Sequence, residues 1–168
     1  METKKILVPV FGSVSVSEIA RISFWLAHNE PAELRIVEVI APPTFFQWLI
    51  SPLLAPFKSN QSLRLQQVQH RAIWKEKLAC EISEQRAPDN VLGIVEAARR
   101  INPDIIIIAF ELRRRLGKEG INELKYRLSE IGSFVLMLLG RGPEMRVEIC
   151  RKKDVLAPDR LASINRKR

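Results

Sequence analysis

The chain has few of the residue types that build metal sites, disulfides and nucleophilic active sites. Its 168 residues include two cysteines and two histidines. Cys80 and Cys150 lie far apart, without a C-x-x-C pair or a Cys/His cluster, which argues against a structural zinc and a disulfide framework. His28 and His70 have no nucleophile beside them in the sequence, and the G-x-S-x-G nucleophile elbow is missing. We therefore predict no metal site, no catalytic residue and no enzyme activity.

The chain also has no long, uninterrupted apolar run. Residues 40–57 (IAPPTFFQWLISPLLAPF) carry no charge, but four prolines divide them. A membrane-spanning helix needs about 20 consecutive apolar residues, so this segment is too short and too broken to be one. The first residues, METKKILVPV, enter a strand pattern directly, without the apolar core and cleavage site of a signal peptide. We expect a cytoplasmic protein without a transmembrane span.

Short apolar runs alternate with helical patterns along the chain. Buried parallel strands are predicted at 5–10 (KILVPV), 33–40 (ELRIVEVI), 78–83, 104–109 (DIIIIA) and 134–139 (FVLMLL). Helices are predicted from Ser17 to before Pro31 and over 59–76, 89–101 and 119–131. The alternation and the right-handed crossover rule predict an α/β fold, an open, doubly wound, five-stranded parallel sheet with helices on both faces. This domain is expected to span 4–139, followed by a basic, partly mobile extension over 140–168.

The order of these patterns resembles the universal stress protein family. The run KKILVPVFGSVSVSEIARISFWLAHNEPAELRIVEVI looks like the family's opening: strand, Gly-Ser turn, helix and second strand. The run VLGIVEAARR, followed by Asn102-Pro103-Asp104 and IIIIA, looks like its third helix leading through an aspartate into its fourth strand. The resemblance covers residues 4–139 and implies the fold predicted above, with ligands at the carboxyl ends of the strands.

Nucleotide-binding members of the family carry an aspartate after the first strand and a loop of form G-x2-G-x9-G-[S/T] after the fourth. This chain has Phe11 at the aspartate position. Counted from Asp104, the loop glycines and the Gly-Ser pair fall on Leu112, Arg115, Lys125 and Tyr126. The resemblance therefore implies a degenerate nucleotide site, in which ATP or AMP is disfavoured and no cofactor is expected. The residual pocket is predicted from the resemblance and the strand ends to comprise the following residues: Phe11, Gly12, Val39, Ala109, Arg113, Arg114 and Arg115.

The arginine run, with Lys118 nearby, has two interpretations. Arg113, Arg114 and Arg115 together can pair with phosphates or carboxylates bidentately at the edge of the sheet. The simpler interpretation is a solvated basic turn that starts a helix, because charged runs in loops commonly bind nothing specific.

The apolar segment over 43–57 departs from the family pattern and leaves three interpretations open. It folds over the vacated pocket and seals it, presents a surface to a protein partner or a second copy, or touches a membrane surface. The side chains that would make such a contact are Phe45, Phe46, Trp48, Leu49, Leu53 and Leu54.

The C-terminal stretch over 141–168 holds nine basic and four acidic residues, a net of +5 out of +8 for the chain. Such a tail can hold nucleic acid or an anionic membrane surface through phosphate contacts. No aromatic stacking platform accompanies it, and we favour a solvated tail. Within it, residues 145–150 (MRVEIC) alternate like an edge strand.

These observations predict a non-enzymatic regulatory or interaction module of the universal stress protein type, with a degenerate nucleotide site, that binds another macromolecule or itself. A homodimer through the last strand, which begins at Phe134 and ends at Leu139, is expected from the resemblance. The first alternative is a sensor of a nucleotide or other phosphate compound that uses Arg113, Arg114, Arg115 and backbone groups at the strand ends. The second is a nucleic-acid or membrane-surface adaptor that uses the tail.

Overall fold

A single mixed sheet organises the part of the chain that the computed structural model describes, namely residues 3–11, 23–25, 28, 31–41, 60–139 and 146–150. Its elements, in chain order, are β1 (Lys4–Val10), β2 (Ala32–Ile40), α3 (Asn60–Trp74), β3 (Ala79–Arg86), α4 (Asn90–Ile101), β4 (Ile105–Ile108), α5 (Phe110–Ser129), β5 (Phe134–Leu138) and β6 (Val147–Cys150). The α/β class predicted from the sequence is confirmed.

The sheet has six strands in the order β3-β2-β1-β4-β5-β6, not the five that were predicted. The first five are parallel, and β6 pairs antiparallel with β5. β6 comes from the stretch assigned above to the C-terminal extension, so the sheet continues to Cys150. The alternating pattern at 145–150 was the signal of this strand. The prediction counted it outside the domain because the resemblance ends at residue 139.

The core lies on β1 and β4 at the centre of the sheet. Ile6, Leu7 and Val8 of β1 and Ile106 and Ile107 of β4 are all at most 1% exposed. Strands covered on both faces read as continuous apolar runs, which is why these two were recognisable in the sequence. The strand register brings Arg35, Leu7, Ile106, Val135 and Cys150 into one row across the sheet.

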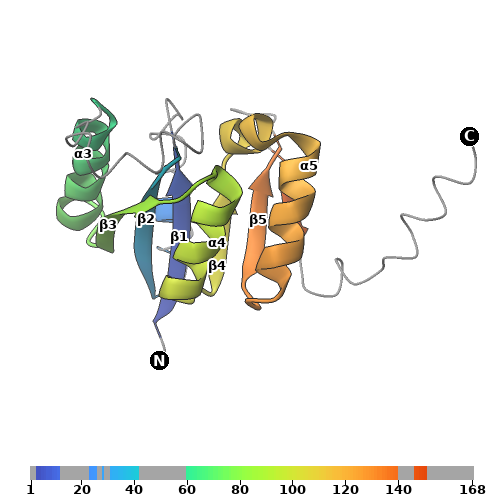
Figure 1. Ribbon diagram of the computed structural model, residues 1–168. Coiled ribbons are helices and arrows are strands. Elements are labelled where there is room, and N and C mark those ends of the chain that lie inside the picture. The colour runs from blue at the N-terminus through green and yellow to red at the C-terminus, as the bar shows by residue number, and fades with distance from the viewer. Residues whose placement is uncertain are drawn as a thin grey trace, which may run out of the picture.

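The helices cover the two faces as the direction of the crossovers requires. The β2–α3–β3 connection runs toward one edge, and the β3–α4–β4 and β4–α5–β5 connections run toward the other. Right-handed crossovers therefore place α3 on one face and α4 and α5 on the other. Figure 1 shows α4 and α5 side by side in front of the sheet.

Local signals set the ends of α4 as predicted. The Asp89 carboxylate accepts a hydrogen bond from the Leu92 amide at 2.8 Å, which caps the first turn. Asn102 ends the helix in the left-handed conformation, directly before Pro103. Asp104, at the start of β4, accepts a hydrogen bond from the Lys5 amide at 2.8 Å and so ties β4 to β1. This is a structural role.

The helix α5 is longer than predicted. It begins at Phe110, nine residues before the predicted start at Glu119, and the arginine run lies in its first two turns. Leu112, Leu124 and Leu128 are fully buried and hold its inner face against the sheet. Gly117 interrupts the helix with a φ of 67° and a ψ of −178°, which only glycine adopts readily. The first turns of this helix were not predicted, because the segment carries many charged residues among the apolar ones that are buried.

Candidate functional site

The carboxyl ends of the central strands are closed by apolar side chains. Phe11, directly after β1, is 3% exposed, and Val39 of β2 and Ala109 after β4 are also buried. Gly12 lies outside the described residues. A ring buried at the aspartate position of the resemblance offers no acceptor for a nucleoside hydroxyl. At least in the described residues, this edge of the sheet is a packed surface.

The chain enters α5 directly after β4, where the resemblance places a phosphate loop. Ala109 precedes the helix, and its carbonyl accepts a hydrogen bond from the Arg113 amide at 3.0 Å. Leu112, at a loop glycine position, is fully buried in the core. Lys125 and Tyr126, at the Gly-Ser position, lie within the same helix. From Arg113 onward, the backbone amides are engaged in helical hydrogen bonds, which differs from an open glycine loop.

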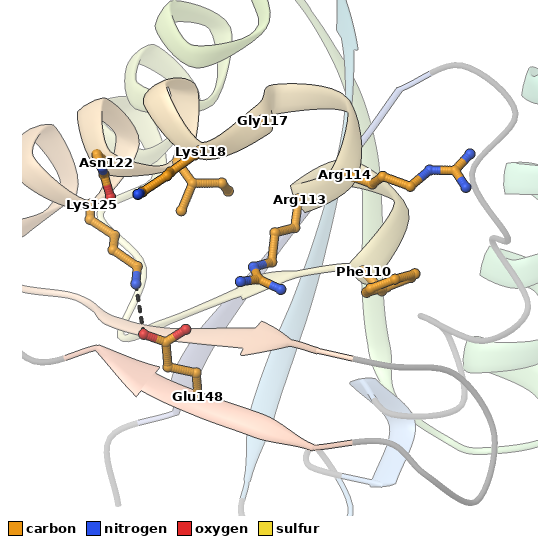
Figure 2. Close-up of a pocket in the computed structure, with 9 residues that line it drawn as sticks. Phe110, Arg113, Arg114, Gly117, Lys118, Asn122, Lys125 and Glu148 are labelled. Atoms are coloured by element: carbon orange, nitrogen blue, oxygen red, sulfur yellow. Dashed lines mark hydrogen bonds and ion pairs between the residues drawn. The ribbon is translucent and has the colours of Figure 1, made fainter.

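The three consecutive arginines point in different directions. The Arg115 guanidinium lies over the Phe11 ring, 5.9 Å from its centroid. Arg114 is largely exposed and pairs with Glu111 at 3.5 Å. Arg113 points from α5 toward the strands (Figure 2). The structure therefore does not gather Arg113, Arg114 and Arg115 around one point.

Arg113 faces a cavity of about 530 Å³ between α5 and the edge strand β6. Its lining residues are Phe110, Arg113, Arg114, Gly117, Lys118, Ile121, Asn122, Lys125 and Glu148. Four of these carry a positive charge and one carries a negative charge. The cavity is strongly cationic, and Phe110 and Ile121 add apolar surface to it.

Glu148 of β6 is the single carboxylate in this lining. Its Oε1 accepts a hydrogen bond from Lys125 Nζ at 2.7 Å. That bond, together with the charges of Lys125 and Arg113, holds the pKa of Glu148 below its ordinary value, although partial burial acts in the opposite direction. The side chains of Arg113 and Lys118 make no hydrogen bond or ion pair with any other described residue. The cavity therefore has cationic groups in excess of its internal partners.

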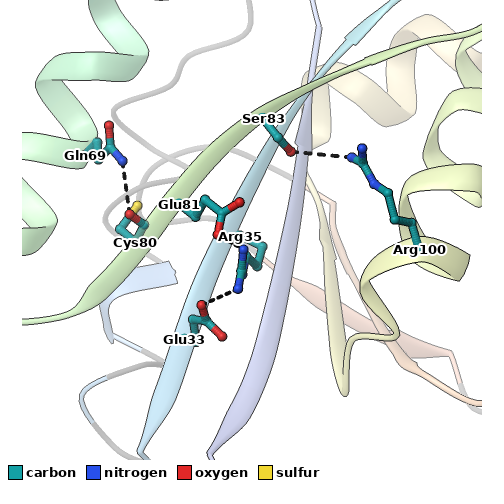
Figure 3. A network of polar contacts seen from close by, with 7 residues as sticks. All are labelled: Glu33, Arg35, Gln69, Cys80, Glu81, Ser83 and Arg100. Carbon is teal, nitrogen blue, oxygen red and sulfur yellow. Dashed lines mark hydrogen bonds and ion pairs between the residues drawn. The ribbon is translucent and has the colours of Figure 1, made fainter.

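A second polar cavity, of about 320 Å³, lies at the other side of the same sheet face. Arg35 of β2 is placed there between Glu33 of its own strand and Glu81 of β3 and pairs with both carboxylates (Figure 3). Arg100 of α4 donates a hydrogen bond to Ser83 Oγ at 3.5 Å. This arrangement joins α4, β2 and β3, and the central cation is matched by its neighbours.

The cysteines and histidines contribute nothing to either cavity. Burial raises the pKa of the Cys80 thiol to about 11 and also raises that of Cys150, so both are protonated and poorly nucleophilic at neutral pH. His28 lies 3.4 Å from Glu76, and His70 stacks near Trp74. Within the described ranges, no group of three His, Cys, Asp or Glu side chains is placed to hold a metal ion.

Several predicted contact regions fall outside the described residues. They are the apolar segment with Phe45, Phe46, Trp48, Leu53 and Leu54, and the basic tail except for residues 146–150. None of the helices in the described part of the chain is long and apolar enough to cross a membrane.

The strand predicted to form a homodimer has no free edge. β5 is hydrogen-bonded to β4 on one side and to β6 on the other, so pairing through the backbone of residues 134–139 is blocked by the chain itself. The outer edge on this side of the sheet belongs to β6. A homodimer contact through residues 134–139 would therefore use side chains and not backbone pairing, and it stays a prediction.

Comparison with known proteins agrees with this architecture. The sequence profile of the universal stress protein family matches residues 2–119, which is most of the chain. The chain belongs to the universal stress protein family. None of the curated protein sequences compared with it matches.

Solved structures of universal stress proteins share the fold. A family member from Burkholderia pseudomallei is 22% identical, with a TM-score of 0.56 over 82% of this chain and 96% of that chain. A universal stress protein in complex with cAMP is 19% identical, with a TM-score of 0.52 over 82% and 97%. One from Archaeoglobus fulgidus in complex with dAMP is 15% identical, with a TM-score of 0.51 over 82% and 98%. At these identities the likeness establishes the fold alone.

Part of the cationic cavity was not found from the sequence. Phe110, Asn122, Lys125 and Glu148 were not named as site residues. The recurrence of Lys118, Asn122 and Lys125 at helical spacing was the available signal on α5. No sequence signal pointed to Glu148, because its position opposite Lys125 depends on how β6 pairs with β5.

Proposed function

We propose that this universal stress protein is a non-enzymatic regulatory or interaction module whose strand-end nucleotide site is degenerate. The observation that carries the proposal is Phe11, which is 3% exposed and covered by the Arg115 guanidinium where the resemblance implies a nucleoside-binding aspartate. Related proteins have been solved with cAMP and dAMP, so adenine nucleotides are the relevant ligands to test.

Two further observations support this proposal. From Arg113 onward, the amides after β4 donate to carbonyl groups within α5, so most of the backbone at the positions of the family's phosphate loop is engaged in the helix. The described thiols have raised pKa values, and the histidines lie beside Glu76 and Trp74, so none of these side chains in the described part of the chain is an activated nucleophile. Binding of another macromolecule or of a second copy then accounts for the function better than turnover of a substrate.

Thermal unfolding with and without millimolar ATP, AMP and cAMP tests the degenerate site. A ligand present at 100 times its dissociation constant adds about 2.7 kcal/mol to the native state, which is roughly 5 to 10 °C for a chain of this size. We expect no shift that depends on Arg115 with any of the three. A shift that disappears in Arg115→Ala and persists in Lys118→Gln would place a working nucleotide site at the strand ends and overturn the proposal.

Self-association through β6 is the form of the homodimer that this fold favours. Val147 and Ile149 of β6 are about half exposed, at 48% and 52%, and Phe134 of β5 is 50% exposed. The register puts these three side chains on the face opposite Glu148, at the outer edge of the described sheet. Sedimentation equilibrium should therefore report a dimer that Ile149→Lys dissociates and that Ile73→Lys, on α3, leaves intact. A wild-type monomer would refute self-association.

The adaptor alternative concerns residues 151–168, whose structure is not described. It predicts binding to nucleic acid or anionic vesicles that falls steeply with salt and is lost when those residues are deleted. Binding that survives the deletion would exclude the tail as the contact.

A further inference from the structure

The cationic cavity between α5 and β6 differs from the strand-end site in position and in chemistry. Arg115 lies over Phe11 at the strand ends, whereas Arg113 points toward the strands and Lys118 lines the cavity beside β6 (Figure 2). Lys125 and Glu148, which complete its wall, lie beyond residues 2–119 matched by the family profile. The cavity therefore depends on a strand that the family resemblance did not predict.

The charges of this cavity are not balanced from within. Arg113, Lys118 and Lys125 face one carboxylate, Glu148, which Lys125 already engages at 2.7 Å. Cations that lie around one space repel one another, and a bound anion removes that repulsion. Arg114 contributes less, because it points away from the cavity and pairs with Glu111.

The interruption at Gly117 changes the backbone beside the cavity. Gly117 leaves the helical conformation, so Lys118 stands at the beginning of a new helical segment that lines the cavity. The first amides of a helical segment, and the positive end of its dipole, favour anions. The same kink ends the segment before Gly117, whose carbonyl end carries the opposite partial charge, so the preference for an anion depends on the side chains.

The size and lining of the cavity indicate the ligand class. A volume of about 530 Å³ exceeds what inorganic pyrophosphate fills and lies within the usual range for small-molecule sites. An arginine with two lysines suits phosphate groups, because arginine binds them bidentately and lysine provides a point charge. Phe110 and the buried Ile121 offer apolar contact to a carbon skeleton.

We propose that this cavity binds a small compound with two or more phosphate groups through Arg113, Lys118 and Lys125. Glu148 acts there as an internal competitor that occupies Lys125 in the absence of the ligand. The inference goes beyond the proposed function, since it concerns a different site with different residues.

Calorimetric titration at constant ionic strength tests this with two probes, inorganic pyrophosphate and fructose 1,6-bisphosphate. We expect both to bind, and the sugar bisphosphate to bind more tightly because it also contacts Phe110 and Ile121. Pyrophosphate binding as tight or tighter would identify an inorganic phosphate site instead.

Arg113→Gln and Lys118→Gln should each weaken binding about tenfold, the usual size of a lost charge-assisted hydrogen bond. Glu148→Gln should tighten it several-fold, because Lys125 is then free for the ligand.

Matched controls on the same helix separate a site from general attraction. Arg127 and Glu123 pair with each other at 2.7 Å and do not line the cavity. Arg127→Gln changes the net charge as Arg113→Gln does, and Glu123→Gln changes it as Glu148→Gln does. Neither control should change the affinity for pyrophosphate or for fructose 1,6-bisphosphate. Equal effects of the cavity and control variants, or no binding to either wild type or Glu148→Gln at millimolar probe, would overturn the proposal. Failure here leaves the nucleotide test at Arg115 unaffected, so the two proposals can fail separately.

Discussion

The two sides of the sheet hold their charges in different ways. On the side of β2, β3 and α4, Arg35 lies between Glu33 and Glu81, and the pairs join neighbouring strands. On the side of α5, β5 and β6, Arg113 and Lys118 make no hydrogen bond or ion pair with a described residue, and Glu148 is the single carboxylate in the cavity. Ion pairs that join neighbouring strands serve the fold, whereas cations that make no ion pair remain available to a ligand of the opposite sign. The difference is why we assign structure to one side and binding to the other.

Thiol alkylation compares the two edges of the sheet and should give the largest effect. Burial raises the pKa of Cys80 on β3 from 9.0 to about 11, a change of 2 units that lowers its thiolate fraction about 100-fold. Iodoacetamide at about pH 8 should therefore label Cys80 about 100-fold more slowly in the native protein than in concentrated urea. Peptide mass spectrometry measures both rates.

Cys150 on β6 serves as the internal comparison, because burial raises its pKa as well. It should also react more slowly in the native protein than in urea. Labelling of Cys150 at the unfolded rate, with Cys80 protected, would show that β6 leaves the sheet. The cavity would then lack its wall, and the comparison would fail.

The packing of α4 provides the second test. A Cβ added at Gly93 would lie 2.5 Å from Val39 Cγ1 and 3.2 Å from Ala87 Cβ. Val39 is buried and β-branched, so it has little freedom to move. Gly93→Ala should lower the free energy of unfolding by about 1 to 3 kcal/mol, despite the better helix propensity of alanine. Urea denaturation measures this.

Gly120→Ala on α5 is the matched control, because its nearest contact is Leu116 Cβ of the same helix at 3.2 Å. It should change the free energy of unfolding by less than about 1 kcal/mol in either direction. A larger loss in Gly120→Ala than in Gly93→Ala would mean that the α5 side is the more tightly packed of the two.

Removal of the central cation on each side compares the charge networks directly. Arg35→Met leaves Glu33 and Glu81 close together without a cation and should cost about 1 to 2 kcal/mol of unfolding free energy. Lys125→Met removes one cation from a surplus and should cost less than about 0.5 kcal/mol. Chemical denaturation of both variants decides this, and equal losses would contradict the distinction between the two sides.

The sequence predicted the parts of this molecule that depend on local pattern. The strands β1 and β4 were recognisable because buried parallel strands are continuously apolar. The helix α4 was recognisable because Asp89 and Asn102 mark its two ends. The family resemblance added the order of the elements and the loss of the nucleotide loop. The sixth strand was missed because its residues were assigned to the C-terminal extension. The first turns of α5 were missed because their many charged residues outnumber the few apolar ones that are buried.

The cavity itself could not have been read from the sequence. Glu148 reaches Lys125 only because β6 returns antiparallel to β5 and pairs Glu148 with Met137. A one-residue slip of that register would turn Glu148 to the opposite face and bring Val147 or Ile149 toward α5. Arg113, Arg114 and Arg115 likewise separated because consecutive residues on a helix project about 100° apart, which a loop would not impose.

The smallest predicted effect is the pH dependence of the Lys125 and Glu148 pair. The hydrogen bond that Glu148 accepts from Lys125 lowers the pKa of Glu148 below 4.5 in the folded protein. The pair therefore contributes stability above about pH 4.5, and this stability is lost as the pH falls through the lowered pKa. Because Glu148 is more than a third exposed, water screens the pair and its contribution stays below about 1 kcal/mol. Urea titrations between about pH 6 and pH 3 measure the difference in unfolding free energy between wild type and Glu148→Gln. This difference should decrease as the pH falls, since Glu148 then becomes neutral, like the glutamine that replaces it in the variant. A difference that stays constant with pH would mean that Lys125 is not held by Glu148, and that the cavity has no internal competitor for a bound phosphate.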